Sequence, residues 1–98
     1  MTAEITVSTQ QKGDAWECRV TVSEGASQTT HAVMVERTYR DKLAGTGVAV
    51  EKLVEKSFEF LLKREPKESI LRSFQLPLIG RYFPEYENAM RGEFGKKS

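Results

Sequence analysis

The sequence is poor in the residues that build disulfides and metal centres. Its 98 residues include one cysteine, Cys18, and one histidine, His31. A single cysteine excludes an intramolecular disulfide and a cysteine-rich zinc site, and these two residues alone cannot supply a triad of two histidines and a cysteine. We therefore expect no metal and no other cofactor.

The chain also lacks long apolar runs and an excess of either charge. No apolar segment approaches the ~18 residues of a membrane span, and residues 1–14 have neither the basic nor the apolar region of a secretory signal. Fifteen basic residues balance fourteen acidic ones, whereas nucleic-acid-binding and membrane-surface proteins usually carry a basic excess. These absences predict a cytoplasmic protein that does not associate with membranes.

What is present begins with hydrophobic patterning of period two. Apolar and polar side chains alternate over residues 4–9 and 16–22, as in strands with one buried face, and residues 29–37 predict a third strand. Short turns separate these segments, and a parallel pair would need a long crossover. The pattern predicts a three-stranded antiparallel meander.

The period changes after a glycine-containing loop expected at 38–47. Residues 48–65 carry apolar side chains three and four positions apart, which predicts one long amphipathic helix. Thr46 is its expected N-cap, and Pro66 ends it. Ser57 lies within the apolar stripe, and we expect it to face the sheet with its hydroxyl bonded to a carbonyl one turn earlier.

Prolines divide the remaining sequence into short segments. Residues 66–74, 76–83 and 84–94 each predict a short helix, because proline is favourable in the first helical turn and unfavourable further along. The elements together predict an α+β fold, in which the meander is followed by one long helix and two or three short C-terminal helices. Residues 1–94 are expected to form a single domain and residues 95–98 a disordered tail.

The reactive side chains form no catalytic pattern. His31 alternates with valines and is expected to be a partly buried, hydrogen-bonded strand residue, and Cys18 a packed, inert thiol. The glycine turn at 45–47 lacks the later glycine of a dinucleotide site and the lysine of a phosphate loop. We identify no catalytic, cofactor-binding or metal-binding residue and predict that the protein is not an enzyme.

The segment 69–87, SILRSFQLPLIGRYFPEYE, contains four of the nine aromatic residues. One interpretation is that it completes the core, with Phe74, Ile79 and Phe83 buried. The other is a helix–turn–helix of about sixteen residues that binds nucleic acid. Arg72, Arg81 and Tyr86 are expected at the surface in the first interpretation, since a core does not easily accept an unpaired guanidinium. The candidate binding surface consists of Lys67, Arg72, Arg81, Tyr82 and Tyr86.

Residues 58–87 resemble a signature of short prokaryotic proteins that have strand-rich N-terminal halves and no assigned activity. The residues that carry the resemblance are FEFLLKREPKESILRSFQLPLIGRYFPEYE, and it implies no functional residue. The order of three strands and a helix is also loosely similar to HicB-like antitoxins, which place a small sheet and helix ahead of a DNA-binding segment. The chain departs from those antitoxins because it lacks a fourth predicted strand and their proline-aspartate signature.

These observations favour a non-enzymatic, cytoplasmic interaction or regulatory module whose partner is another protein or a second copy of the chain. The alternative is a nucleic-acid-binding regulator that uses residues 66–91. In that case the basic side chains would converge on one surface to contact phosphates. They are Lys67, Arg72, Arg81, Lys96 and Lys97.

Overall fold

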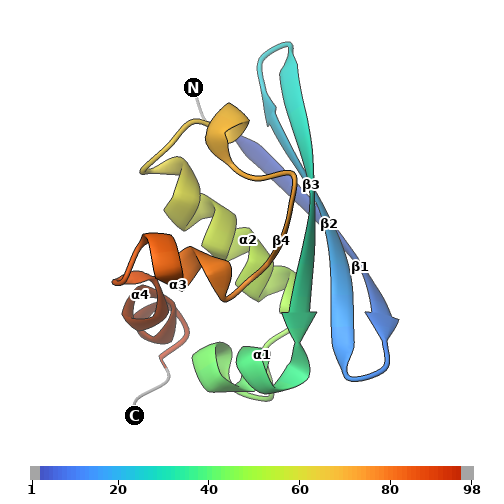
Figure 1. Cartoon of the computed structure of the whole chain (residues 1–98), viewed down its shortest axis with the longest axis vertical. Coiled ribbons are helices and arrows are strands. Elements are labelled where there is room, and N and C mark those ends of the chain that lie inside the picture. The colour runs from blue at the N-terminus through green and yellow to red at the C-terminus, as the bar shows by residue number, and fades with distance from the viewer. Residues whose placement is uncertain (1–2, 96–98) are drawn as a thin grey trace.

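The computed structural model describes residues 3–95 and has an α+β fold. Its sheet has the order β1-β2-β3-β4, with β1 at Glu4–Lys12, β2 at Ala15–Glu24, β3 at Ser27–Glu36 and β4 at Ser73–Gln75. The helices are α1 (Arg37–Ala44), α2 (Val50–Leu62), α3 (Leu78–Tyr82) and α4 (Tyr86–Glu93), with a one-turn 3₁₀ helix, η1, at Lys67–Ser69. All of the helices lie on one side of the sheet (Figure 1).

The first three strands confirm the predicted antiparallel meander. Both ladders run without interruption from one end of the strands to the other. Each hairpin closes with a two-residue loop whose first residue is a glycine with positive φ, 63° at Gly13 and 60° at Gly25. A type II′ turn has glycine at this position, and its twist matches that of the flanking strands. The turns therefore hold the register that places one apolar face of the meander under the helices.

The fourth strand was not predicted, and the prediction of a helix over 66–74 is wrong. Only η1 is helical there, and Ile70 already has extended dihedral angles. β4 runs parallel to β3, with the Ala32 N–H donating to the Arg72 carbonyl at 2.7 Å and the Leu76 N–H donating to the Met34 carbonyl at 3.0 Å. The extended conformation is thus supported by a strand some forty residues away, which no local pattern reveals.

The predicted loop at 38–47 is wrong in its first part, because α1 occupies most of it. Arg40 connects this helix to its surroundings. Its guanidinium donates a 2.8 Å hydrogen bond to the Val48 carbonyl and lies 5.0 Å from the centre of the Trp16 ring. A cation over an indole ring is favourable, so α1 is held against both β2 and the segment that leads into α2.

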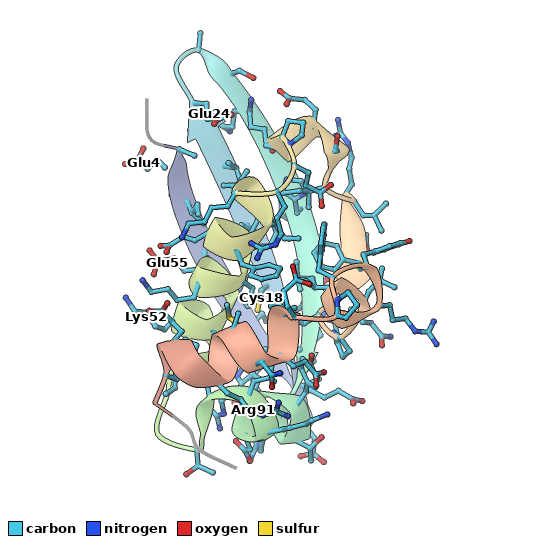
Figure 2. All side chains as sticks on the ribbon, turned by 90° about the vertical axis from the view of Figure 1, so that its left-hand side faces the viewer. Glu4, Cys18, Glu24, Lys52, Glu55 and Arg91 are labelled. Carbon is cyan, nitrogen blue, oxygen red and sulfur yellow. The ribbon has the colours of Figure 1, made fainter. Side chains whose placement is uncertain are left out.

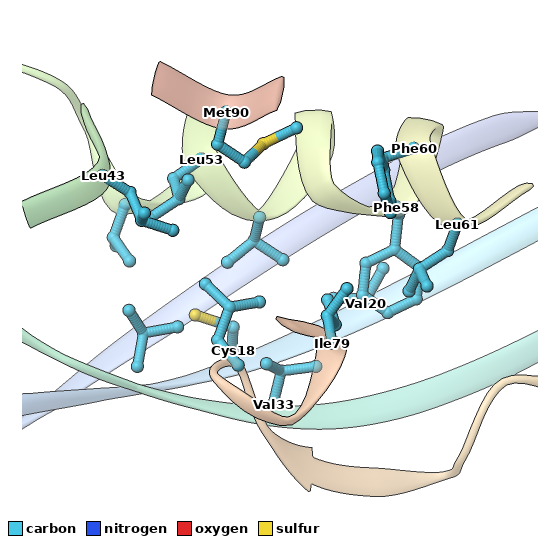
Figure 3. Close-up of a cluster of buried hydrophobic side chains, with 14 of the residues drawn as sticks. Cys18, Val20, Val33, Leu43, Leu53, Phe58, Phe60, Leu61, Ile79 and Met90 are labelled. Atoms are coloured by element: carbon cyan, nitrogen blue, oxygen red, sulfur yellow. The ribbon is translucent and has the colours of Figure 1, made fainter. Parts of the chain in front are cut away.

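Helix α2 confirms the long amphipathic helix but is shorter than predicted. Its N-cap is Ala49, not Thr46, and it ends at Leu62, ahead of Pro66. Its buried side chains meet those of the sheet, α1 and α4 in one core (Figure 3). Two short helices, α3 and α4, follow within the predicted segments 76–83 and 84–94.

Ser57 is buried within α2, and its hydroxyl donates to the Leu53 carbonyl at 2.7 Å as predicted. The expectation that it faces the sheet is wrong. Its Oγ lies 2.6 Å from the Tyr86 hydroxyl and 3.7 Å from the Met90 sulfur, both on α4. The serine thus provides a polar contact between α2 and α4, two helices that cross in Figure 2.

Candidate functional site

An apolar groove of about 410 Å³ opens between the end of α2, residues 69–74 and α3. We call it the 61–83 groove. Its apolar lining includes Leu61, Leu71, Phe74, Leu78, Tyr82 and Phe83, and Glu65 is its one charged lining residue. Most of the lining residues therefore belong to the aromatic segment 69–87 that the sequence singled out, on the β4 side of the sheet.

Two side chains of the groove are unusually exposed. Leu71 is 48 % and Tyr82 is 66 % exposed, whereas Ile70 and Ile79 beneath them are almost completely buried. If a partner covered these side chains, removing their apolar surface from water would stabilise the complex by about 25 cal/mol per Å² buried. The groove thus combines a fixed floor with two apolar side chains that no described residue covers.

The backbone next to Leu71 is held by a buried histidine. His31, on β3, is 2 % exposed. Its Nδ1 lies 2.8 Å from the Leu71 carbonyl and its Nε2 lies 2.9 Å from the Thr29 hydroxyl, while its ring stacks at a tilt 5.3 Å from that of Phe58. Both ring nitrogens are used in the fold, which confirms the structural role expected for this histidine.

Tyr86 supports the groove from below, and the expectation that it lies at the surface is wrong. It is fully buried, and burial raises the pKa of its hydroxyl. Since the Ser57 hydroxyl donates to Leu53, the Tyr86 hydroxyl is the donor in the bond between them. The Phe60 ring packs edge-on against both Tyr86 and Phe83, with ring centres 5.3 and 5.9 Å apart. Tyr86 therefore positions the groove wall without lining it.

Lys67 is also absent from the accessible surface, although the sequence placed it on the candidate binding surface. It is 3 % exposed, and its Nζ lies 2.7 Å from a Glu68 oxygen and 3.2 Å from a Glu24 oxygen. The hydrogen bond to Glu68 is the main reason that the pKa of Lys67 is raised. A lysine with two carboxylate partners ties η1 to the end of β2 and has no free charge for phosphate.

The remaining predicted site residues are accessible. Arg72 and Arg81 are exposed, neither forms an ion pair with a described residue, and each precedes a lining residue or follows one in the chain. Lys96 and Lys97, which the nucleic-acid interpretation also required, lie outside the described residues. Of the five predicted residues, the structure brings Tyr82 into the groove. Arg81 is next to Tyr82 in sequence, and Arg72 is next to Leu71, another lining residue.

Sequence reasoning missed Leu71 as a groove residue. The sequence placed it in a short helix predicted over 66–74. Because Ile70 is extended, adjacent side chains point to opposite sides, and Ile70 is buried while Leu71 is exposed. Ile79 is buried as predicted, and Phe74 and Phe83 are half-buried because they form groove walls.

Other reactive groups do not form a second site. Cys18 is fully buried, and burial raises the pKa of its thiol to about 12, so it is a poor nucleophile at neutral pH. Across residues 3–95, no three histidine, cysteine or acidic side chains gather in a way that could hold a metal ion. No helix in that range has the length and apolar character needed to cross a bilayer.

Comparison of the chain with protein-family models, with curated proteins and with solved structures finds no match.

Proposed function

We propose that this protein is a non-enzymatic interaction module of the cytoplasm whose 61–83 groove binds an apolar segment of another protein. The observation that carries the proposal is that Leu71 and Tyr82, the most exposed large apolar side chains among residues 3–95, line the same groove. Single exposed apolar residues are ordinary, but an apolar hollow with a polar rim is typical of a binding site.

The groove is suited to a side chain inserted from a partner. Its floor is formed by buried residues, and the packing of Phe60 against Phe83 holds one wall, so little ordering is required on binding. Tyrosine and arginine are enriched among residues that contribute most to interfaces, and Tyr82 is flanked by Arg81. We expect the partner segment to present a large apolar residue with acidic residues nearby, which would meet Arg72 and Arg81.

A pull-down with matched variants tests this function. The bait would be the parent protein, the groove variant Leu71→Ser/Tyr82→Ser, and a control variant Gln28→Ser/Thr30→Ser, which alters two exposed residues of β3. Each bait would be exposed to a native cell extract with and without nuclease. We expect one protein to be retained by the parent and the control, to fall about tenfold or more with the groove variant, and to be unaffected by nuclease.

Two outcomes would contradict the proposal. One is that every retained protein binds the groove variant as well as the parent. The other is retention of nucleic acid that weakens steeply with salt and is lost in Arg72→Ala/Arg81→Ala. That second result would favour the nucleic-acid-binding alternative, because phosphate contacts give binding its salt dependence.

A further inference from the structure

The sheet has a long free edge at β1, on the opposite side from the groove. β1 is the terminal strand of the sheet order, and β2 is its one neighbour. The hydrogen bonds of the sheet show which backbone groups point away from β2. The Arg37 N–H donates to the Asp14 carbonyl, so the Asp14 carbonyl points towards β3 and that of Ala15, its neighbour, points towards β1. Backbone direction alternates along a strand.

This alternation assigns the outward groups of β1. Ala15 is paired with Lys12, so the N–H and C=O groups of Lys12 and of every second residue before it point towards β2. The residues between them point outward: Ile5, Val7, Thr9 and Gln11. No described residue forms a hydrogen bond with these outward groups.

β1 also lacks the features by which proteins block an exposed edge. Natural edge strands are short, bulged, interrupted by proline or charged. β1 has nine residues and an unbroken ladder, and its positions 5–11, ITVSTQQ, contain no proline and no charge. At the other edge β4 has three residues, which is short enough to offer little backbone to a partner.

The charges of β1 stand at its two ends and have opposite sign. In an antiparallel pair, residues that point outward face each other. The outward residues of β1 all have odd numbers, so the numbers of two facing residues add to an even sum. The sum of 16 is the even sum that pairs all nine residues of β1 with those of an identical strand. It places Ser8 opposite Ser8 on the twofold axis and Glu4 opposite Lys12 of the second copy, on the same face of the sheet.

We propose that β1 pairs antiparallel with β1 of a second copy of this chain, about a twofold axis at Ser8, and so joins two four-stranded sheets into one. The outward groups of Ile5 and Val7 then bond with those of the copy's Gln11 and Thr9. Pairing would also bury more of the half-exposed side chains of Ile5 and Val7, which favours association. Glu4 lies at the outer margin of the sheet (Figure 2), and it forms no ion pair with a described residue.

Cross-linking tests the register directly. In this arrangement Ser8 forms a non-hydrogen-bonded pair with its copy, with Cα atoms about 4.5 Å apart, which lies within the range of a disulfide. We expect Ser8→Cys to form a covalent dimer under mild oxidation. Thr6→Cys and Gln10→Cys are matched controls on the same face, but each lies four residues from its own copy, about 13 Å along the strand, and should remain monomeric. Cys18 is buried and unchanged in all three.

A charge swap tests the same register without a covalent bond. We expect Glu4→Lys and Lys12→Glu each to weaken dimerisation about tenfold by replacing two opposite-charge pairs with like-charge pairs, and the double swap to restore it. Lys12 also lies 2.9 Å from Glu17 within its own chain, and a loss confined to that pair would not be rescued by the swap. Sedimentation equilibrium across a concentration series measures each variant.

Three results would overturn the proposal. The first is a monomer at every concentration. The second is a dimer that Ser8→Cys does not cross-link and the charge swaps do not alter, which would place the interface elsewhere. The third is that the outward amides of β1 become protected from hydrogen exchange only when a different protein from a cell extract is added. The groove variant Leu71→Ser/Tyr82→Ser should dimerise like the parent, so that failure of the groove and failure of the β1 edge are distinguishable.

Discussion

The two edges of the sheet present different chemistry. At β1, a strand of nine residues, every second residue offers its backbone donor and acceptor at the free edge, and the side chains there are mostly polar. At β4, three residues offer little backbone, but the segment around them carries the exposed Leu71 and Tyr82 and the groove between them. Backbone recognition depends on strand register, whereas a groove depends on particular side chains. Substitutions should therefore separate the two surfaces cleanly.

The β4 side depends on a few buried anchors, and Tyr86 is the largest of them. We expect Tyr86→Ala to lower the free energy of unfolding by about 3–5 kcal/mol, because it leaves a cavity under Phe60 and removes the partner of Ser57. Urea denaturation at fixed protein concentration measures the loss. Ser8→Ala, at the β1 edge, is the control and should be close to neutral. A Tyr86→Ala variant that unfolds at the parent's midpoint would show that this side is not held by the tyrosine.

Substitutions of Ser57 test whether the contact between α2 and α4 is closely packed. We expect Ser57→Leu to cost about 1–3 kcal/mol through crowding against Tyr86 and Met90. Ser57→Ala should cost a similar amount, about 1–3 kcal/mol, for a different reason, because it leaves the buried Tyr86 hydroxyl without its acceptor. Combining Ser57→Ala with Tyr86→Phe should cost less than the sum of the two single changes. Additive losses would mean that the hydroxyl pair contributes nothing.

The sequence predicted the β1 side better than the β4 side, for a physical reason. Period-two alternation and the two glycine turns are local signals, so residues 4–36 could be assigned as a meander. β4 depends on hydrogen bonds to β3, and Lys67 is buried because Glu24, distant in sequence, pairs with it. Neither contact has a local pattern. The candidate binding surface was therefore predicted in the segment that forms most of the groove, but Lys67 and Tyr86 were wrongly placed at the surface.

The exposed groove residues should contribute to binding and not to folding. We expect Leu71→Ser/Tyr82→Ser to change the free energy of unfolding by no more than about 0.5 kcal/mol, as is usual for exposed positions. The same variant should lose most of its binding to the proposed partner. Thermal melts and the pull-down would be carried out on the same preparation. A large loss of stability would mean that these side chains complete the core, and the groove would then lose its main support as a binding site.

The smallest effect concerns acid stability at the β4 side. The hydrogen bond from Lys67 is the main reason that the pKa of Glu68 is lowered. A carboxylate with a lowered folded-state pKa stabilises the protein above its unfolded pKa, near 4.3, and this contribution is lost as the pH falls through the folded value. We expect Glu68→Gln to reduce the loss of stability between about pH 5 and 3. The control is Glu65→Gln, because Glu65 has no ion pair to a described residue. An equal loss of stability on acidification in the parent and in Glu68→Gln would contradict the assignment.

The most direct test of the difference between the two edges is amide hydrogen exchange at low and high protein concentration. At low concentration the outward amides of β1, those of Ile5, Val7, Thr9 and Gln11, should exchange fast while the alternate amides, bonded to β2, exchange slowly. At high concentration the outward amides should become protected as well, and the amides of β4 and the groove should not change. Outward β1 amides that exchange fast at every concentration would contradict the pairing of β1 with a second copy.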